Sequence, residues 1–143
     1  MPTKPNMLRL LTLGTLGCYW TAIFIGTHLP SGLGKMPNFN DKCLHLGAYA
    51  GLAFLLAAAL TAFRLKRGTL LITLAVAAVY GCVDELTQML VNGRQADVAD
   101  WAADVFGAGV GAVAFAVGLL LITGRFPNTA SSDEIVVESS DPT

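Results

Sequence analysis

The chain has 143 residues, of which 54% are hydrophobic and only 13% are charged, and its mean hydropathy is +0.60. A soluble domain carries about 25% charged residues, so this composition excludes an ordinary soluble domain and indicates a membrane protein. The formal net charge is −1 and no basic stripe is present, which excludes a nucleic-acid partner because nothing would neutralise its phosphates.

The first apolar run covers residues 7–29 and has Lys4 and Arg9 at its beginning. A secretory signal peptide has a shorter apolar core and ends at a small-x-small cleavage site, whereas Gly26-Thr27-His28 is a poor site of that kind. The run is about long enough to cross the hydrocarbon of a bilayer, which takes about 20 residues. We therefore predict a retained transmembrane helix here.

Three further apolar runs predict helices at about 44–63, 69–91 and 98–123. Together with the first run they predict an all-α fold, in which residues 1–126 form a polytopic membrane protein with four transmembrane helices in a compact bundle. The tail, 127–143, is rich in serine and acidic residues and shows no apolar period, so we predict a disordered segment.

The distribution of positive charge predicts the orientation of these helices. The N-terminus, the second connection and the tail hold six of the nine basic residues, namely Lys4, Arg9, Arg64, Lys66, Arg67 and Arg125. The first and third connections hold Lys35, Lys42 and Arg94. By the positive-inside rule both termini are cytoplasmic, and the first and third connections face outward.

Polar groups in different helices fall at one depth. Counting about 20 residues from each cytoplasmic anchor ends near the outer boundary of the membrane. The groups at that level are His28, His45, the segment 84–88 and Asp104. Acids at membrane depth are costly and usually face a bundle interior or a wet cavity, so this level predicts a site.

Small residues predict which helices meet there. Gly47 and Gly51 in the second helix, and Gly107 and Gly111 in the fourth, form small-xxx-small patterns that let backbones approach closely. We expect these two helices to pack together, which would bring His45 towards Asp104.

The residues before and in the second helix suggest proton transfer. Asp41 and His45 are four residues apart and could share a helix face, so the carboxylate could orient an imidazole that exchanges a proton near neutral pH. The alternative is a helix cap followed by an interfacial histidine. Lys42 either binds an anionic headgroup or extends its amine to the membrane surface.

The acids of the third helix allow two interpretations. Gln88 lies on the faces of both Asp84 and Glu85 by the three- and four-residue spacing, and at least one of these acids must be hydrogen-bonded or protonated when buried. They could work as acid, base or ligand-binding groups. The alternative is a structural clamp to Arg94 or His45.

Arg94 follows the Asn92-Gly93 turn and is the best phosphate or carboxylate binder in the chain. Its alternative partners are Asp97 and Asp100, which also suit the start of the fourth helix. Asp104 lies two turns further on, too deep to cap that helix. We predict His45, Asp84, Glu85 and Asp104 as catalytic groups, and Asp41, Lys42, Gln88, Arg94, Asp97 and Asp100 as binding groups.

The sequence predicts neither a cofactor nor a metal ion. One histidine beside carboxylates leaves a metal site possible, but no pair of ligands has metal-type spacing. Cys18, Cys43 and Cys82 are scattered through apolar segments and fit three buried thiols. We interpret His28 as a loop residue.

Three blocks of the sequence together resemble the VanZ-like family of small bacterial membrane proteins. They are DKCLHLGAY (41–49), YGCVDELTQ (80–88) and GRQADVADWAADVFGAGVG (93–111). Position 104 is commonly asparagine in that family, so Asp104 adds a charge. The shared polar positions of the family fall on the ten catalytic and binding groups predicted above, from Asp41 to Asp104.

The namesake of the family is an accessory protein associated with low-level resistance to teicoplanin, a drug that meets lipid-linked cell-wall precursor outside the cytoplasmic membrane. The resemblance therefore implies an outward polar pocket that binds or modifies the headgroup of an envelope lipid or lipid-linked precursor. The alternative is a non-catalytic structural or accessory subunit whose polar residues only lock the helices. A proton-coupled carrier is disfavoured because no acid lies deep in the cytoplasmic half of any helix.

Overall fold

A computed structural model describes residues 7–29, 38–65 and 68–127 of the chain. These contain four helices, α1 (Met7–Thr27), α2 (Asn38–Ala62), α3 (Thr69–Gln88) and α4 (Val98–Thr123), and no strand. Each helix is long and apolar enough to cross a membrane. The predicted all-α bundle of four transmembrane helices is thus confirmed.

Local signals set the two ends of α4 where the sequence predicts them. The Asp97 carboxylate accepts a hydrogen bond from the Ala99 N–H at 2.8 Å, which satisfies one of the free amides at the helix start. At the other end Gly124 has φ 67° and donates its N–H to the Leu120 carbonyl, as in a left-handed helix cap.

The bounds of the other three helices differ from the prediction, and α1 ends at Thr27 and not at residue 29. α2 begins at Asn38 and not at residue 44, because its polar first turns continue the helix beyond the apolar run. α3 ends at Gln88 and not at residue 91, since Leu90 and Val91 bond to carbonyls only three residues back. The predicted disordered tail, from residue 128 on, lies outside the described residues.

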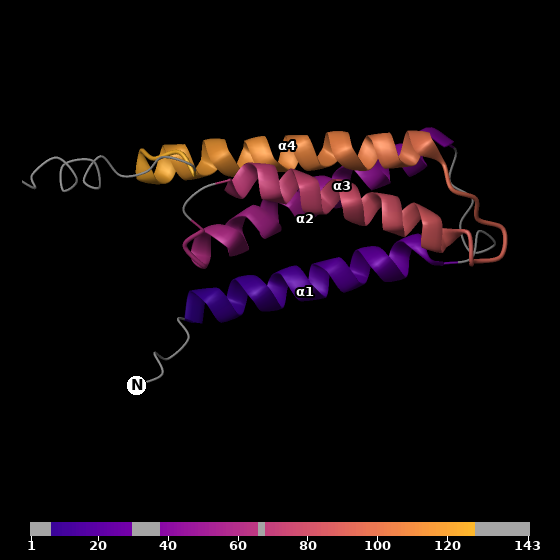
Figure 1. Cartoon of the computed structure of the whole chain (residues 1–143), viewed down its shortest axis with the longest axis horizontal. Coiled ribbons are helices and arrows are strands. Elements are labelled where there is room, and N and C mark those ends of the chain that lie inside the picture. Colours follow the sequence, from indigo (N-terminus) through magenta and orange to yellow (C-terminus); the bar gives the residue numbers. More distant parts are fainter. Residues whose placement is uncertain (1–6, 30–37, 66–67, 128–143) are drawn as a thin grey trace, which may run out of the picture.

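Helices α2, α3 and α4 pack closely, and α1 lies along one side of them (Figure 1). The tightest contact joins α4 to α2. A Cβ atom built on Gly107 would overlap the Leu46 carbonyl, and one on Gly111 would overlap the Ala50 carbonyl. The expected packing of the second helix against the fourth is present, and glycine permits it because lipid provides no hydrophobic drive between helices.

The glycines of α2 do not have the expected role in this contact. A Cβ on Gly47 would meet nothing within 4 Å, so this residue is not at a close approach. A Cβ on Gly51 would instead meet the ring of Tyr19, whose hydroxyl donates a hydrogen bond to the Ala48 carbonyl at 3.2 Å. Gly51 therefore makes room for α1.

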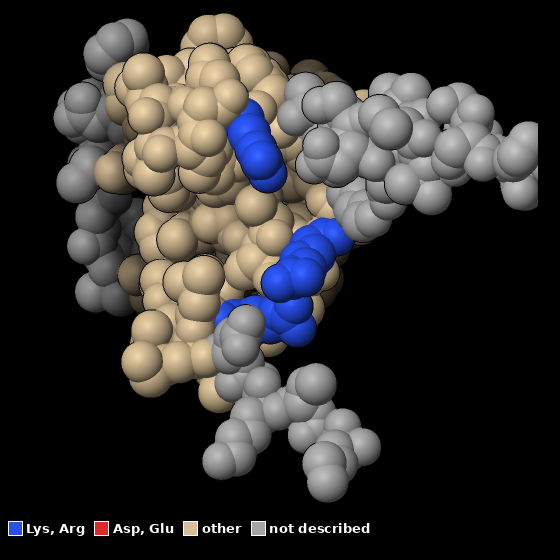
Figure 2. Space-filling view, turned by 90° about the vertical axis from the view of Figure 1, so that its left-hand side faces the viewer, with Lys and Arg blue, Asp and Glu red and all other residues tan. Residues whose placement is uncertain are grey.

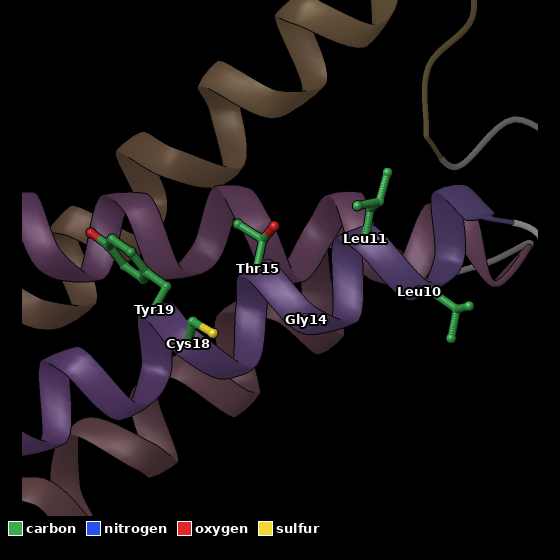
Figure 3. A pocket seen from close by; sticks show the side chains of 6 residues that line it. All are labelled: Leu10, Leu11, Gly14, Thr15, Cys18 and Tyr19. Atoms are coloured by element: carbon green, nitrogen blue, oxygen red, sulfur yellow. The ribbon is translucent and has the colours of Figure 1, made fainter.

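Helix α1 buries little of its surface inside the chain. Leu16 and Ile23 are its buried residues, and most of its other apolar side chains are exposed. A shallow, mainly apolar depression lies on this helix (Figure 3), lined by Leu10, Leu11, Gly14, Thr15, Cys18 and Tyr19. Such a surface suits contact with lipid chains.

The charged residues divide between the two ends of the bundle. One end carries every aspartate and glutamate in the described part of the chain, at the C-terminal end of α3, the N-terminal ends of α2 and α4, and the loop before α4. The opposite end carries Arg9, Arg64 and Arg125, and Arg9 Nε donates to the Ala62 carbonyl at 3.0 Å. Figure 2 shows basic and no acidic side chains on that face. We call the acidic end the polar end.

Candidate functional site

The polar end is built where α1 and α3 finish and α2 and α4 begin (Figure 1). Five of its polar side chains are at least 95% buried, which is costly for charged groups unless they are paired. They are His45 on α2, Asp84, Glu85 and Gln88 on α3, and Asp104 on α4. The sequence predicted all five as site residues, and the fold brings them together.

His45 and Asp104 form a buried pair between α2 and α4. The imidazole Nδ1 lies 2.9 Å from Asp104 Oδ1, within hydrogen-bond distance. The close approach of the two helices at Gly107 holds these residues in reach of each other. Asp104 thereby orients the imidazole. The sequence predicted that His45 would lie towards Asp104, but it named Asp41 as the carboxylate that could orient the ring.

The second oxygen of Asp104 has a different environment. Asp104 Oδ2 is buried and has no hydrogen-bond partner in the described part of the chain. It faces Gly81 on α3, where a Cβ atom would lie 3.1 Å from this oxygen. Gly81 thus keeps a space beside the carboxylate that a larger residue would fill.

Asp84 connects α3 to the end of α1. It lies within hydrogen-bond distance of the Thr27 hydroxyl at 3.0 Å and of the Gln88 amide at 3.0 Å. His28 Nδ1 lies 3.8 Å from the same carboxylate. Asp84 thus secures the loosely packed α1 at the polar end.

His28 is the residue that sequence analysis missed. It does lie in the turn after α1, but its Nε2 is 3.0 Å from the Thr87 hydroxyl and its ring stacks on Phe24. Its depth on the helix was the signal that placed it at this level. The contact of His28 with α3 could not be predicted from the position of His28 in the chain.

Glu85 holds the start of α4. Its Oε2 accepts a hydrogen bond from the Asp97 N–H at 2.8 Å, and its Oε1 lies 3.4 Å from the Gln88 amide. The alternative partners considered for a clamp, Arg94 and His45, make no hydrogen bond to Glu85 among the described residues. The carboxylate instead fixes the backbone just before α4.

Lys42 and Arg94 have different partners from those expected. Lys42 Nζ lies 3.1 Å from Asp97 and 2.7 Å from Asp100. A hydrogen bond from the Ala99 N–H and the neighbouring Lys42 ammonium lower the pKa of the Asp97 carboxyl below its usual value. In the described chain, therefore, Lys42 and not Arg94 pairs with these acids.

Arg94 bonds to the rim of the buried cluster. Its Nε donates to the Leu29 carbonyl at 3.2 Å, and its Nη1 donates to Gln88 Oε1 at 3.4 Å. The guanidinium is therefore held between Leu29 and Gln88, and Arg94 is partly exposed. Of the basic side chains in the described part of the polar end, His28, Lys42 and His45 each lie beside a carboxylate, whereas Arg94 does not.

Two groups of side chains have ligand-type atoms within 4.8 Å of one another. One group is fully buried and consists of His45, Glu85 and Asp104. The other shares His45 and adds the partly buried Asp41 and Asp100. The sequence predicted no metal site, and the spacing along the chain could not show that three helices bring these atoms together.

A groove of about 340 Å³ opens between the end of α3 and the start of α4. It is lined by Cys82, Glu85, Leu86, Ala96, Asp97, Val98 and Trp101. The indole of Trp101 donates to the Ala78 carbonyl at 3.0 Å, which fixes one wall. An apolar groove thus runs up to the buried Glu85.

The family model described as VanZ/LLP1 matches residues 21–121. This range begins in the second half of α1 and ends near the end of α4, so it includes the whole polar end. Neither a curated protein nor a solved structure matches the chain.

Proposed function

The chain belongs to the VanZ/LLP1 family, and from this membership and the geometry of the polar end we propose that this membrane protein binds or modifies the anionic headgroup of an envelope lipid or lipid-linked precursor. The observation that carries the proposal is the burial of His45, Asp84, Glu85 and Asp104 together, next to an apolar groove. Intramembrane ionisable groups of this kind are a functional-site hypothesis by default.

The orientation is part of the proposal. The basic end of the bundle would face the cytoplasm with both termini, and the polar end would face outward. In a bacterial cytoplasmic membrane, that places the cluster at the level where lipid-linked precursor is exposed. A role in low-level teicoplanin resistance would follow from action on that precursor.

Arg94 is the first candidate to hold the headgroup. Its planar fork can bind two oxygens of a phosphate, and its present partners are a carbonyl and an amide oxygen rather than a carboxylate. Lys42 would bind the headgroup only if the phosphate replaced one of its two aspartate partners, Asp97 or Asp100. The lipid chain would lie in the groove beside Trp101.

If a reaction occurs, the buried pair supplies the acid–base group. Asp104 holds the His45 ring in one orientation and stabilises its protonated form, so the imidazole can take a proton from a nucleophile and return it to a leaving group. Asp84 and Glu85 would assist as neighbouring carboxyl groups.

Binding of a polyprenyl phosphate to the full chain in lipid nanodiscs tests the proposal. We expect saturable binding that Arg94→Gln weakens roughly tenfold to hundredfold, because a hydrogen-bonded charge is lost. The matched control, Arg64→Gln at the basic end, should bind as wild type. Equal binding of the phosphate-free polyprenol, or no effect of Arg94→Gln, would contradict the proposal.

A second candidate, a non-catalytic structural or accessory subunit, is favoured by the internal bonding of the cluster. Lys42 with its two aspartates, Asp84 with Thr27, and Glu85 with a backbone amide all join different segments. This candidate predicts that His45→Ala and Glu85→Gln lower the thermal stability in detergent, whereas headgroup compounds leave the stability unchanged.

A further inference from the structure

We infer that His45, Glu85 and Asp104 form a binding site for one divalent transition-metal ion, such as Mn²⁺ or Zn²⁺, between α2, α3 and α4. The three side chains come from three helices, each is at least 95% buried, and their ligand-type atoms lie within 4.8 Å of one another. Binding of the metal ion at this site requires this chain alone and no lipid headgroup.

The unpartnered oxygen of Asp104 is the second observation that points to a ligand. Asp104 is completely buried, yet its Oδ2 accepts no hydrogen bond in the described part of the chain. A buried anionic oxygen without a partner is costly, and bound cations are a common way to satisfy one. Gly81 places no side chain against this oxygen, whereas a Cβ atom there would lie 3.1 Å from it.

The known distances fit metal coordination. With metal–ligand bonds of about 2.1 Å, neighbouring ligands of an octahedral ion are about 3.0 Å apart and opposite ligands about 4.2 Å apart. The 2.9 Å between His45 Nδ1 and Asp104 Oδ1 matches one edge of such an arrangement. Since His45 and Asp104 are then neighbouring ligands, the Glu85 oxygen must lie about 3.0 Å from at least one of their ligand atoms. It already lies within 4.8 Å of both, and side-chain rotation would have to close the rest.

The balance of charge also favours a cation. Asp84, Glu85 and Asp104 are three buried carboxyl groups on neighbouring faces of α3 and α4. In the described part of the chain, the basic groups that pair with these carboxylates are imidazoles, His28 with Asp84 and His45 with Asp104. Arg94 reaches only the Gln88 amide oxygen at the rim of the cluster. A divalent ion would neutralise two carboxylates inside the membrane, where unpaired charges are costly.

The chemistry of the ligands selects the class of metal. One imidazole with two carboxylates suits borderline ions such as Zn²⁺, Mn²⁺ and Fe²⁺ better than Ca²⁺ or Mg²⁺, which prefer oxygen alone. The outer group of Asp41, His45 and Asp100 is the weaker candidate. Asp100 is already held by Lys42 at 2.7 Å, so a cation there would have to displace an ammonium.

Mn²⁺ titration of the full chain, purified in detergent and treated with a chelator, tests the inference by electron paramagnetic resonance. We expect about one bound ion per chain, with an echo-modulation signal from a coordinated imidazole nitrogen. Asp104→Asn keeps the size of the side chain and a hydrogen-bond acceptor for His45 but removes the charge. Glu85→Gln on α3 likewise keeps the size of the side chain and an acceptor for the Asp97 N–H but removes the charge. Both substitutions should weaken metal binding about tenfold or more.

Asp100→Asn is the matched control, because it alters the outer group and leaves the buried one intact. It should bind Mn²⁺ as wild type does, and circular dichroism with size-exclusion elution shows whether each variant is folded. No binding of Mn²⁺ or Zn²⁺ at millimolar concentration would overturn the inference. So would equal binding by all variants, or a loss in Asp100→Asn that Glu85→Gln does not share.

Discussion

Gly107→Ala should destabilise the protein, because it places a methyl group against the backbone of α2. The new Cβ would overlap the Leu46 carbonyl oxygen and lie 2.9 Å from both the carbonyl carbon and Cα of that residue. Ordinary contacts between carbon atoms are about 3.5–4.0 Å, so the helices would have to separate by roughly 1 Å. Overpacking of this kind costs about 1–3 kcal/mol.

Gly109→Ala on the same helix is the control for intrinsic helix preference. A Cβ at Gly109 would meet nothing within 4 Å. Alanine in a helix interior is favoured over glycine by about 0.5–1 kcal/mol, so this variant should be neutral or slightly more stable. Because the helix preference is common to both variants, their free energies of unfolding should differ by the overpacking cost, about 1–3 kcal/mol.

Reversible unfolding in mixed detergent micelles measures both free energies. The same separation of α2 and α4 would lengthen the 2.9 Å contact between His45 and Asp104, since these residues lie within one turn of the overlap. Gly107→Ala should therefore also lose any ligand bound at the buried cluster. If Gly107→Ala proves as stable as Gly109→Ala, the close packing of α2 on α4 is refuted.

Three further predictions concern single groups. Tyr19→Phe removes the hydrogen bond to the α2 backbone and should cost about 1 kcal/mol in thermal or denaturant unfolding. Tyr49→Phe removes a buried hydroxyl that has no hydrogen-bond partner among the described residues, so it should cost nothing; equal losses would contradict this. The pKa of the Asp97 carboxyl is lowered below 3.8, so the stability that this carboxylate contributes is complete at neutral pH and is lost as the pH falls through the lowered pKa. The difference in melting temperature between wild type and Asp97→Ala should therefore shrink between pH 7 and below pH 3, and a difference that stays constant would contradict this prediction. In intact cells, with the chain's other cysteines replaced, Asn92→Cys should react with a membrane-impermeant maleimide and Arg64→Cys should not, and the reverse pattern would invert the proposed orientation.

The helices were predictable because each signal acts locally. Apolar runs of membrane-spanning length predicted four helices, and Asp97 and Gly124 mark the ends of α4 as cap residues do. The start of α2 was predicted six residues late, since the polar segment before the apolar run has no hydropathy signal of its own.

The contacts within the site were only partly predictable. Counting depth from the basic anchors placed the polar groups at one level, and the glycine spacing brought α4 to α2, which together led to the contact of His45 with Asp104. Spacing does not show which face of a helix is turned to which neighbour. For that reason the role of Gly47 was wrong, and the contacts of His28 and Lys42 emerged only from the fold.

The proposed site requires the contact between α2 and α4 at the polar end, and a double-mutant cycle on His45 and Asp104 tests this contact directly. The free energies of unfolding of wild type, His45→Gln, Asp104→Asn and the double variant would be measured with chelator present. A buried hydrogen bond to a charged group predicts a coupling of about 1.5–3 kcal/mol. Additive effects of the two substitutions would show that the side chains do not meet, and the proposed site would be wrong.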